Sequence, residues 1–377
     1  MDYNQLALDL HKKYKGKITT TLRDQSELSR ELLSAYYSPG VGAVSKAIAE
    51  DPAKLPEYTW TNNLVAVISD GSAVLGLGNI GPKGAMPVME GKALLFKHFA
   101  GIDSIPIVLD VHSPDEIVAT VTAMAPSFGA INLEDIAAPQ CFEIEERLKK
   151  TLDIPVFHDD QHGTAIVTLA GLINAMKVVG KQLKDTKIVV IGAGAAGTAI
   201  IKLLHRYAQP HMVAVDSKGI ISTDRSDLNQ EKQALLEYVD GSIAGNLEDA
   251  LTDADIFIGV SQPGLLTPEF IKKMAEKPVV FALANPIPEI MPDIAKDAGV
   301  AVIATGRSDF PNQVNNAVAF PGIFRGALDN GVTRITDDHK LAAAEAIASL
   351  VDNPDADTVI PSVFDDRIVP TIARVIK

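Results

Sequence analysis

Two pairs of acidic residues, Glu134-Asp135 and Asp159-Asp160, each follow a short apolar segment of the chain. If both segments are strands of one parallel sheet, their carboxyl ends deliver four carboxylates to the same edge. Mg²⁺ and Mn²⁺ prefer oxygen ligands of this kind. The pattern indicates a divalent-metal site. In a chain with 48 acidic residues, however, acidic pairs are also typical of solvated turns and helix caps.

His158 and His162 flank the second acidic pair, four residues apart. This spacing can hold zinc when both histidines lie on one helix. Gly163 and the preceding strand argue against a helix here, and no third nitrogen or sulfur ligand is evident. Histidines that cap a helix or form hydrogen bonds are the favoured interpretation.

Lys92 lies in a segment, 86–99, whose pattern predicts a helix. Its apolar neighbours at helical spacing are Val88, Met89, Leu95, Phe96 and Phe99. They direct the amine toward a core or a cleft, where burial would lower the pKa of Lys92 and make it a base near neutral pH. A lysine that extends its amine back to the solvent fits the same pattern.

Tyr37 precedes the turn Ser-Pro-Gly-Val-Gly, which can present a phenol to a cleft. A phenol can donate a proton to a carbanion or enolate, although a structural tyrosine is the commoner case. Asn285 follows a predicted strand and Asn316 lies in a loop rich in turn formers. Carboxamides at the ends of such strands can meet a nicotinamide and its substrate, or can form local turns.

A glycine-rich sequence follows the predicted strand 187–191 and opens a helix. Its residues are Gly192, Gly194, Ala195, Ala196 and Gly197. Glycines at this spacing allow a tight turn and a close approach of the backbone to a pyrophosphate, which then lies at the helix N-terminus. The strand before and the helix after make this a dinucleotide-binding fingerprint rather than a plain turn.

Asp216 ends the next predicted strand, 19 residues after Gly197. An acid at this place can bind the ribose hydroxyls of NAD and repel the 2′-phosphate of NADP. We therefore expect NAD, although Lys218 could contact a 2′-phosphate. A second GxGxxG, from Gly76 to Gly81, has no such acid, and the Pro-Lys-Gly after it delays any helix; we interpret it as a loop that shapes the backbone near the substrate.

These side chains need a scaffold of alternating strands and helices. The pattern predicts a helix over 165–179 and strands at 64–69, 105–109, 154–157, 187–191, 212–215, 255–260, 279–283 and 300–304. This alternation is typical of α/β folds with parallel sheets. We predict an N-terminal α/β substrate and catalytic domain over residues 1–158 and a C-terminal Rossmann-type, doubly wound parallel sheet over residues 159–377.

The composition argues against several classes of function. The net charge of -14 disfavours nucleic acid or an anionic membrane as a partner. The single cysteine, Cys141, permits no intrachain disulfide and fits a reducing compartment. The N-terminus lacks the pattern of a signal peptide, and the longest apolar stretch, 188–201, is too short to span a bilayer. We expect a cytoplasmic protein.

Taken together, these motifs resemble malic enzyme, in the bacterial form with a small subunit. The resemblance covers about residues 14–328. It rests on the order and joint presence of YYSPGVGAV, SDGSAVLGLGNIGPKGAMPVMEGKALLFKHFAGID, INLEDIAAPQCF, IPVFHDDQHGTA, VVIGAGAAGTA, FALANPIPE and PNQVNNAVAFPG. It implies oxidative decarboxylation of (S)-malate to pyruvate and CO₂ with a nicotinamide cofactor, NAD or NADP, and Mg²⁺ or Mn²⁺.

The resemblance also implies roles for individual residues. Lys92 matches the base and Tyr37 the general acid, and Asp159 would steady Lys92. The remaining matches are Glu134, Asp135 and Asp160 as metal ligands, and Asn285 and Asn316 as contacts to substrate and nicotinamide. Larger relatives carry an arginine where this chain has Ala73, so its contact with the substrate or cofactor must be replaced or absent.

Members of the family are commonly homodimers, and the resemblance implies the same here. Two alternative functions stay open at this point. A malolactic enzyme shares the site but keeps its NAD bound and returns the hydride to give lactate. A non-catalytic, regulatory NAD-binding protein would keep only the fold, and the presence of Lys92, Tyr37 and the acidic residues argues against it.

Overall fold

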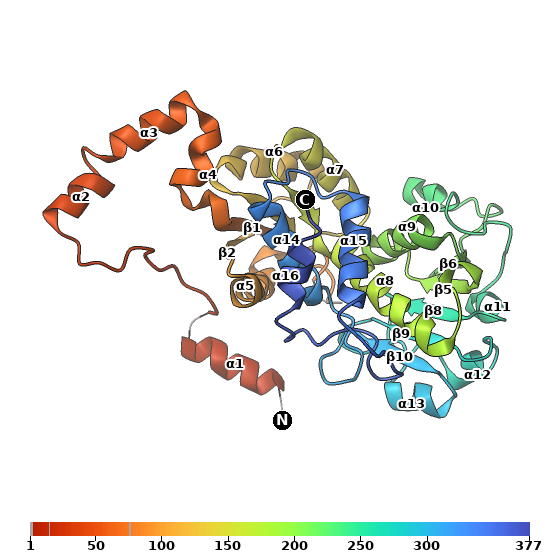
Figure 1. The fold of residues 1–377 in the computed structure, drawn as a ribbon. Helices are drawn as coiled ribbons and strands as arrows, with labels where there is room; N and C mark the ends of the chain where they lie inside the picture. Colours follow the sequence, from red (N-terminus) through yellow and green to blue (C-terminus); the bar gives the residue numbers. More distant parts are fainter. Residues whose placement is uncertain (1–2, 15, 75–76) are drawn as a thin grey trace.

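The computed structural model describes residues 3–14, 16–74 and 77–377. Its body contains two β-sheets with helices packed on their faces, and an N-terminal arm projects from that body (Figure 1). The expected α/β class with parallel sheets is confirmed.

Four parallel strands form the first sheet, in the order β2-β1-β3-β4. They are β1 (Leu64–Ser69), β2 (Asp103–Val108), β3 (Ala130–Leu133) and β4 (Val156–His158). The helices around them are α5 (Gly81–Ala100), α6 (Pro114–Met124), α7 (Gln140–Thr151) and α8 (Asp159–Val179). Alternate residues of β1 enter opposite cores, because Ala66 and Ile68 pack with α6 and α7, whereas Val65 and Val67 pack with α5 and α8.

The second sheet has six strands in the order β10-β9-β8-β5-β6-β7, and only β7 is antiparallel. The strands are β5 (Lys187–Ile191), β6 (His211–Asp216), β7 (Gly219–Ile220), β8 (Ile256–Gly259), β9 (Val279–Ala282) and β10 (Val302–Thr305). The strand order reverses between β5 and β8. In doubly wound sheets, ligands bind at the carboxyl edge of this reversal.

Helices cover both faces of the second sheet. One face packs against α8 and α9 (Ala195–Ala208), while α15 (Asp337–Ala348) packs on α8 and α14 (Phe320–Asp329) packs on α5. The other face packs against α11 (Leu247–Leu251), α12 (Pro268–Ile271) and α13 (Pro292–Asp297). The remaining helices of the body are α4 (Leu55–Tyr58), α10 (Gln230–Leu235) and α16 (Ile368–Ala373).

Helix α8 joins the two halves of the body. It follows β4 directly and packs against α9 and α15 of the second half. By length and composition alone α8 could cross a membrane, which no stretch was expected to do, but 72% of its most apolar window is buried inside the protein, as in a core helix. One large core contains residues from both halves, so the boundary between residues 158 and 159 stays a prediction.

The first turns of two helices differ from the sequence expectations. Helix α5 begins at Gly81, so Pro82 does not delay the helix; proline is tolerated in a first turn because its missing N–H would have no helical partner there. Helix α8 begins at Asp159 rather than near residue 165. The positive end of the helix dipole favours its two N-terminal aspartates. Gly76 lies outside the described residues.

An N-terminal arm precedes the first sheet. It comprises α1 (Tyr3–Tyr14), an extended segment, α2 (Arg30–Tyr36) and α3 (Val41–Glu50). None of the three helices has a buried residue. Figure 1 shows α2 and α3 standing apart from the body. Helices of this length are marginal without a packed face, so the arm requires a further surface to pack against.

Candidate active site

Three acidic side chains meet at the carboxyl edge of the first sheet. Glu134 and Asp135 follow β3, and Asp160 lies in the first turn of α8, which follows the neighbouring strand β4. One carboxylate oxygen of each residue lies within 4.8 Å of the other two. The structure therefore brings the two acidic pairs together, as expected from strand ends that share one edge.

This acidic group has the chemistry of a divalent-cation site. All of its donors are carboxylate oxygens, and Glu134 and Asp135 are only 2% and 4% exposed. Three carboxylates, those of Asp159, Glu134 and Asp160, act on the single ammonium of Lys92. Burial raises the pKa of Glu134 to about 7, against the opposing effect of Lys92. A bound divalent cation would compensate the carboxylate charge that the single ammonium of Lys92 does not neutralise.

The backbone at Asp135 is also unusual. Its φ of 53° lies in the left-handed region, which residues other than glycine seldom adopt and which is often found at functional sites. In this conformation its backbone N–H donates a hydrogen bond to Asp160 Oδ2 at 2.8 Å. Its carbonyl accepts a hydrogen bond from the N–H of Ala73 at 3.0 Å. Ala73, which stands where larger relatives carry an arginine, therefore lies next to the acidic group.

Lys92 reaches the same edge from α5. Its Nζ lies 2.5 Å from Asp159 Oδ2 and 2.9 Å from Glu134 Oε1, and its side chain is only 10% exposed. Burial favours the neutral amine, but the nearby carboxylates outweigh burial and raise the pKa of Lys92 above its usual value. The expectation of a lowered pKa is therefore wrong for this structure, because sequence spacing on one helix does not reveal the facing acids.

Two aromatic rings support Lys92. Its Nζ lies 4.6 Å from the ring centroid of Phe320, the first residue of α14, where the face of the ring attracts a cation. Phe320 in turn packs edge-on against Phe96, with ring centroids 4.7 Å apart. The sequence does not single out Phe320, because it is far from Lys92 along the chain and belongs to a different domain.

The two histidines differ in their surroundings. His162 lies in α8, and its Nε2 is 2.9 Å from both carboxylate oxygens of Glu145 on α7. His158 is the residue before α8 and is completely buried. Within the described part of the chain, neither histidine belongs to a group of three candidate metal ligands. His162 thus forms the kind of hydrogen bond that was expected, whereas both ring nitrogens of His158 are buried without a hydrogen-bond partner among the described residues and its Nδ1 lies 3.8 Å from Asp160 Oδ2. The segment 159–163 is helical, contrary to the expectation.

The structure does not bring Tyr37 to this site within one chain. Tyr37 follows α2 in the N-terminal arm and is 70% exposed. Figure 1 shows α2 standing apart from the body, to which α5 with Lys92 belongs. Tyr37 can therefore act in catalysis only if the arm packs against an active site that it does not contact in this structure.

The glycine-rich loop has the geometry that a pyrophosphate requires. Gly192 has a φ of 106°, and a Cβ there would lie 2.6 Å from the Val260 carbonyl oxygen. A Cβ at Gly197 would overlap with the carbonyl oxygen of Gly192, whereas a Cβ at Gly194 would meet nothing within 4 Å. The outer glycines thus permit the tight turn from β5 into α9 and its close approach to Val260 at the end of β8, and open space remains where α9 begins with Ala195 and Ala196.

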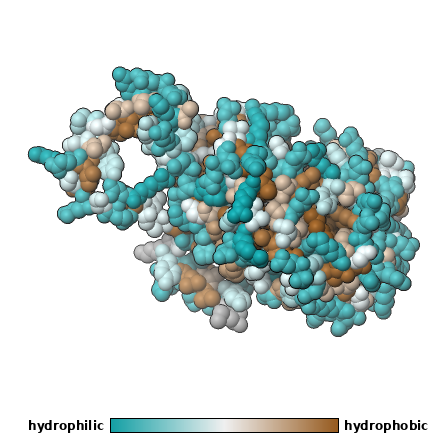
Figure 2. Space-filling model, viewed as in Figure 1, coloured by the Kyte–Doolittle hydropathy of each residue, from teal (hydrophilic) through white to brown (hydrophobic). Residues whose placement is uncertain are grey.

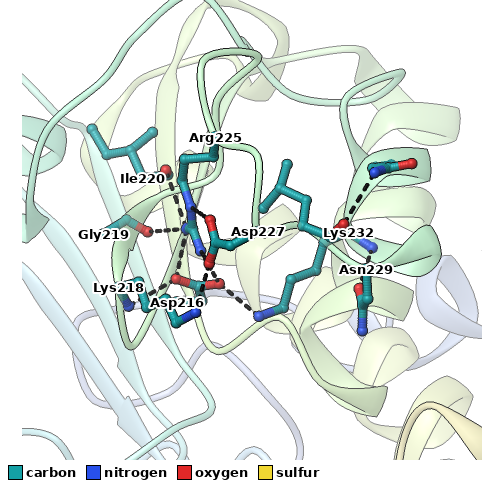
Figure 3. A network of polar contacts seen from close by, with 10 residues as sticks. Asp216, Lys218, Gly219, Ile220, Arg225, Asp227, Asn229 and Lys232 are labelled. Atoms are coloured by element: carbon teal, nitrogen blue, oxygen red, sulfur yellow. Dashed lines mark hydrogen bonds and ion pairs between the residues drawn. The ribbon is translucent and has the colours of Figure 1, made fainter.

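Asp216 ends β6, as expected, but its carboxylate is already engaged (Figure 3). Arg225 donates to both carboxylate oxygens, at 2.7 and 3.1 Å, and Lys232 Nζ donates at 2.6 Å. The backbone N–H of Lys218 donates at 2.9 Å. Arg225 and Lys232 are functional candidates that sequence reasoning missed; the run of cations at 218, 225 and 232 was the available signal.

Two asparagines and a buried glutamate lie at the carboxyl edge of the second half. A Cβ at Gly163 would overlap with Asp159 Oδ1 and lie 3.0 Å from the Cβ of Asn316, so Asn316 is next to the Lys92 partner. Asn285 follows β9. The buried carboxylate of Glu289 accepts hydrogen bonds from the N–H groups of Ser261 and Ala284, at 3.0 and 3.1 Å, and thereby ties the ends of β8 and β9 together.

The chain matches two sequence families over almost its whole length. Residues 12–149 match the malic enzyme N-terminal domain, and residues 161–374 match the malic enzyme NAD-binding domain.

Individual proteins with high sequence identity to this chain have related names. The chain is 54% identical over 380 residues to a bifunctional malic/malolactic enzyme of Bacillus subtilis, covering all of this chain and 92% of the relative. It is 54% identical over 364 residues to an NAD-dependent malic enzyme of Geobacillus stearothermophilus, covering 96% and 76%. It is 50% identical over 379 residues to an NADP-dependent malic enzyme of Halomonas elongata, covering 97% and 89%.

Solved structures share the fold. The NAD-dependent malic enzyme of Thermotoga maritima is 50% identical, with a TM-score of 0.95 and 98% of each chain covered. The malic enzyme of Entamoeba histolytica is 41% identical, with a TM-score of 0.96, covering 99% of this chain and 80% of that one.

Proposed function

Because the chain belongs to the malic enzyme family, we propose that it catalyses the metal-dependent oxidative decarboxylation of (S)-malate to pyruvate and CO₂, with NAD as the hydride acceptor. One observation carries this proposal. The buried amine of Lys92 contacts Glu134 and Asp159 beside three clustered carboxylates, and this cluster is next to a domain with a complete dinucleotide fingerprint.

Glu134, Asp135 and Asp160 would hold the metal, because they are the described acids whose carboxylate oxygens converge. When bound, Mg²⁺ or Mn²⁺ supplies a Lewis acid that polarises the oxygen on C2 and stabilises negative charge during decarboxylation. The dinucleotide supplies the acceptor for the hydride from C2, and the loop of Gly192, Gly194 and Gly197 would hold its pyrophosphate.

Lys92 would accept the proton of the C2 hydroxyl. To do so it must be neutral, and in the structure three carboxylates oppose neutrality. Compensation of the charges of Glu134 and Asp160 would remove two of these three influences and would lower the pKa of Lys92 toward the range in which the buried amine can be neutral. Asp159, at 2.5 Å, holds the amine in place, and Asn285 and Asn316 would orient the nicotinamide and the substrate.

Tyr37 would donate the proton that C3 requires after CO₂ has left. Since Tyr37 lies on an exposed arm, we propose that two copies of the chain form a homodimer in which each arm supplies Tyr37 to its neighbour's site. No nucleic acid or membrane partner is part of this proposal. The buried, unpaired Cys141 is compatible with work in the cytoplasm.

The test follows the absorbance of reduced nicotinamide in the presence of malate, Mn²⁺ and NAD, with EDTA as the control. Formation of reduced cofactor and pyruvate, both abolished by EDTA, is the expected result. Lactate without reduced cofactor would instead identify the malolactic reaction, which the name of the Bacillus subtilis relative includes. The absence of every product would refute both activities.

A further inference from the structure

A polar cavity of about 240 Å³ lies between the helices α7, α8, α9 and α15. Its described lining contains neither Lys92 nor any of the three proposed metal ligands. We propose that this cavity binds a phosphate group, and that the bound phosphate influences the active site through Glu145. The binding is independent of the proposed function, and only the influence on malate turnover rests on it.

The floor of the cavity carries more buried positive than negative charge. Lys340 of α15 is 7% exposed, and Glu145 of α7 is 5% exposed. Glu145 already pairs with Lys149 at 2.6 Å, so one buried carboxylate serves two ammonium groups. Lys340 also pairs with Asp337 at 2.9 Å, but the Asp337 side chain is 59% exposed, and water weakens the effect of an exposed charge. The floor therefore favours an anion.

The protonation of Lys340 reflects the same imbalance of charge. Burial and the charge of Lys149 lower the pKa of Lys340, although Asp337 and Glu145 oppose this change. A phosphate in the cavity would replace the missing negative charge and stabilise the protonated amine.

Thr198 supplies an unused polar group to the same cavity. It lies on α9 and is 4% exposed, and its hydroxyl oxygen has no hydrogen-bond partner among the described residues. A buried polar atom without a partner destabilises a fold. An oxygen of a bound phosphate would accept a hydrogen bond from this hydroxyl, whereas an apolar ligand would leave it unpaired.

The rim of the cavity adds a further cation. Lys202 of α9 is exposed and lies over the ring of Tyr238, 5.9 Å from its centroid, so its ammonium is available to a ligand. Because the donors come from two helices, α9 and α15, the four oxygens of a tetrahedral phosphate can meet them together. A planar carboxylate presents only two oxygens. The volume holds a ligand of several atoms rather than one water molecule.

Glu145 connects this cavity with the start of α8. Its two carboxylate oxygens each lie 2.9 Å from His162 Nε2, and Oε1 accepts a hydrogen bond from the backbone N–H of His158 at 3.1 Å. His158 immediately precedes Asp159 and Asp160. A phosphate in the cavity adds negative charge beside Glu145, and the contacts of Glu145 transmit this change to the first turn of α8.

Calorimetry with the full-length protein tests the binding. The protein is titrated with inorganic phosphate, with excess NAD to occupy the glycine-rich loop and without divalent metal. We expect saturable binding of one phosphate per chain. Lys340→Met and Lys202→Ala should each weaken this binding at least about tenfold, as is typical of a lost charge-assisted hydrogen bond, and Thr198→Val about threefold. A parallel titration with methyl phosphate distinguishes the two sources of the group, because tighter binding of the ester identifies a phosphate monoester as the ligand.

Lys184→Ala is the matched control, because it removes an exposed lysine outside the lining of the cavity and should leave the affinity unchanged. Lys202 is exposed, so Lys202→Ala tests the site even if replacement of the buried Lys340 impairs folding. The absence of saturable binding of either probe would overturn the proposal. So would an unchanged affinity in both Lys202→Ala and Lys340→Met.

The kinetics of malate oxidation test the influence on the active site. At constant ionic strength and constant free Mg²⁺, saturating phosphate should shift kcat/KM for malate at least about twofold in the unaltered protein and not in Lys340→Met. A shift that persists in Lys340→Met would locate the effective phosphate elsewhere and overturn the coupling. Phosphate binding without malate oxidation would refute the proposed function but keep the anion site, and malate oxidation without phosphate binding would do the reverse.

Discussion

At the scale of single residues, Lys92 illustrates how a side chain acquires its chemistry from its surroundings. Its helix gives it apolar neighbours, but its protonation is governed by Asp159 and Glu134, which come from other elements. Burial raises the pKa of Asp159 to about 6, even though Lys92 opposes that change. The site therefore contains more buried negative charge than one amine can compensate, which is the property that a divalent metal would use.

Replacement of Lys92 tests its role as the base. We expect both Lys92→Ala and Lys92→Arg to lower kcat about 10²–10⁴-fold, because neither side chain can accept a proton from the substrate. Lys92→Arg keeps the positive charge and so separates proton transfer from charge balance. Lys97→Ala, which removes an exposed lysine from the same helix, should keep full activity. Near-normal turnover in Lys92→Arg would rule out the role as a base.

Replacement of Glu134 tests the metal site without relying on catalysis. Glu134→Gln keeps the shape of the side chain but removes one of the three convergent charges. Mn²⁺ affinity, measured by electron paramagnetic resonance, should fall by more than about tenfold. Glu143→Gln, on the exposed surface of α7, should bind Mn²⁺ as the unaltered protein does. Unchanged affinity in Glu134→Gln would exclude Glu134 as a ligand.

Asp216 makes stability depend on pH. Burial alone would raise its pKa, but Arg225, Lys232 and the N–H of Lys218 lower the pKa of Asp216 to about 2 in the folded state. Because this value lies below that of the unfolded chain, about 3.9, the stabilisation is complete above pH 4 and is lost as the pH falls toward 2.

Urea denaturation of the unaltered protein and of Asp216→Asn measures this effect. The difference in the free energy of unfolding should be largest above pH 4 and should shrink at lower pH. A difference that is constant across this range would show that the charge of Asp216 does not stabilise the fold.

At the scale of elements, the start of α8 brings the two halves of the site together. The helix begins directly after β4, so Asp159 and Asp160 occupy its first turn, while Gly163 allows Asn316 to approach from the second half. Glu289 likewise connects two elements, because it accepts hydrogen bonds from the backbone at the ends of β8 and β9. The acids are positioned against the dinucleotide domain by the ends of strands, by the start of α8 and by the short distance between Gly163 and Asn316, rather than by long side chains.

Gly163 provides the test at this scale. In Gly163→Ala the new methyl group would overlap with Asp159 Oδ1 and press on Asn316. We expect kcat to fall by at least about tenfold, because displacement of about 1 Å at a reacting group is costly, together with a lower melting temperature. Gly91→Ala in α5 meets only the flexible end of Lys17 and should be neutral or stabilising by up to about 1 kcal/mol. Normal activity in Gly163→Ala would show that the close approach is dispensable.

At the scale of the whole molecule, the N-terminal arm is the part that a single chain leaves unexplained. Among the residues that the structure describes, thirteen of the twenty-one large exposed apolar side chains lie between residues 3 and 44. Figure 2 shows apolar patches on the arm and open space between it and the body. Exposed apolar surface of this extent marks an interaction site, and a second copy of the chain is the partner that a symmetric exchange of arms would supply.

Mixed dimers test whether Tyr37 acts on the neighbouring chain. Tyr37→Phe and Lys92→Ala are each expected to be nearly inactive. If Tyr37 acts across the dimer, a mixed dimer has one complete site, so unfolding and refolding the two variants together should restore about one quarter of normal activity. If both residues act within one chain, no mixed dimer has a complete site and activity stays near zero, which would contradict the exchange of arms.

Features that depend on short stretches of chain can be predicted from the sequence alone. Strand positions follow from apolar runs, and the fingerprint from Gly192 to Gly197 follows from its strand, turn and helix. The two acidic pairs were placed at one edge because each follows a strand. The order and joint presence of the motifs also identified the family, which the matches over residues 12–149 and 161–374 confirm.

Properties that arise between distant residues became visible in the folded chain. Lys92 and Asp159 are 67 positions apart, and their contact reverses the expected direction of the Lys92 pKa. The contacts of Arg225 and Lys232 occupy Asp216, and the exposed arm separates Tyr37 from Lys92. The periodicity of a sequence predicts which face of a helix or strand is apolar. The charge balance around a side chain depends on every element that packs against that side chain.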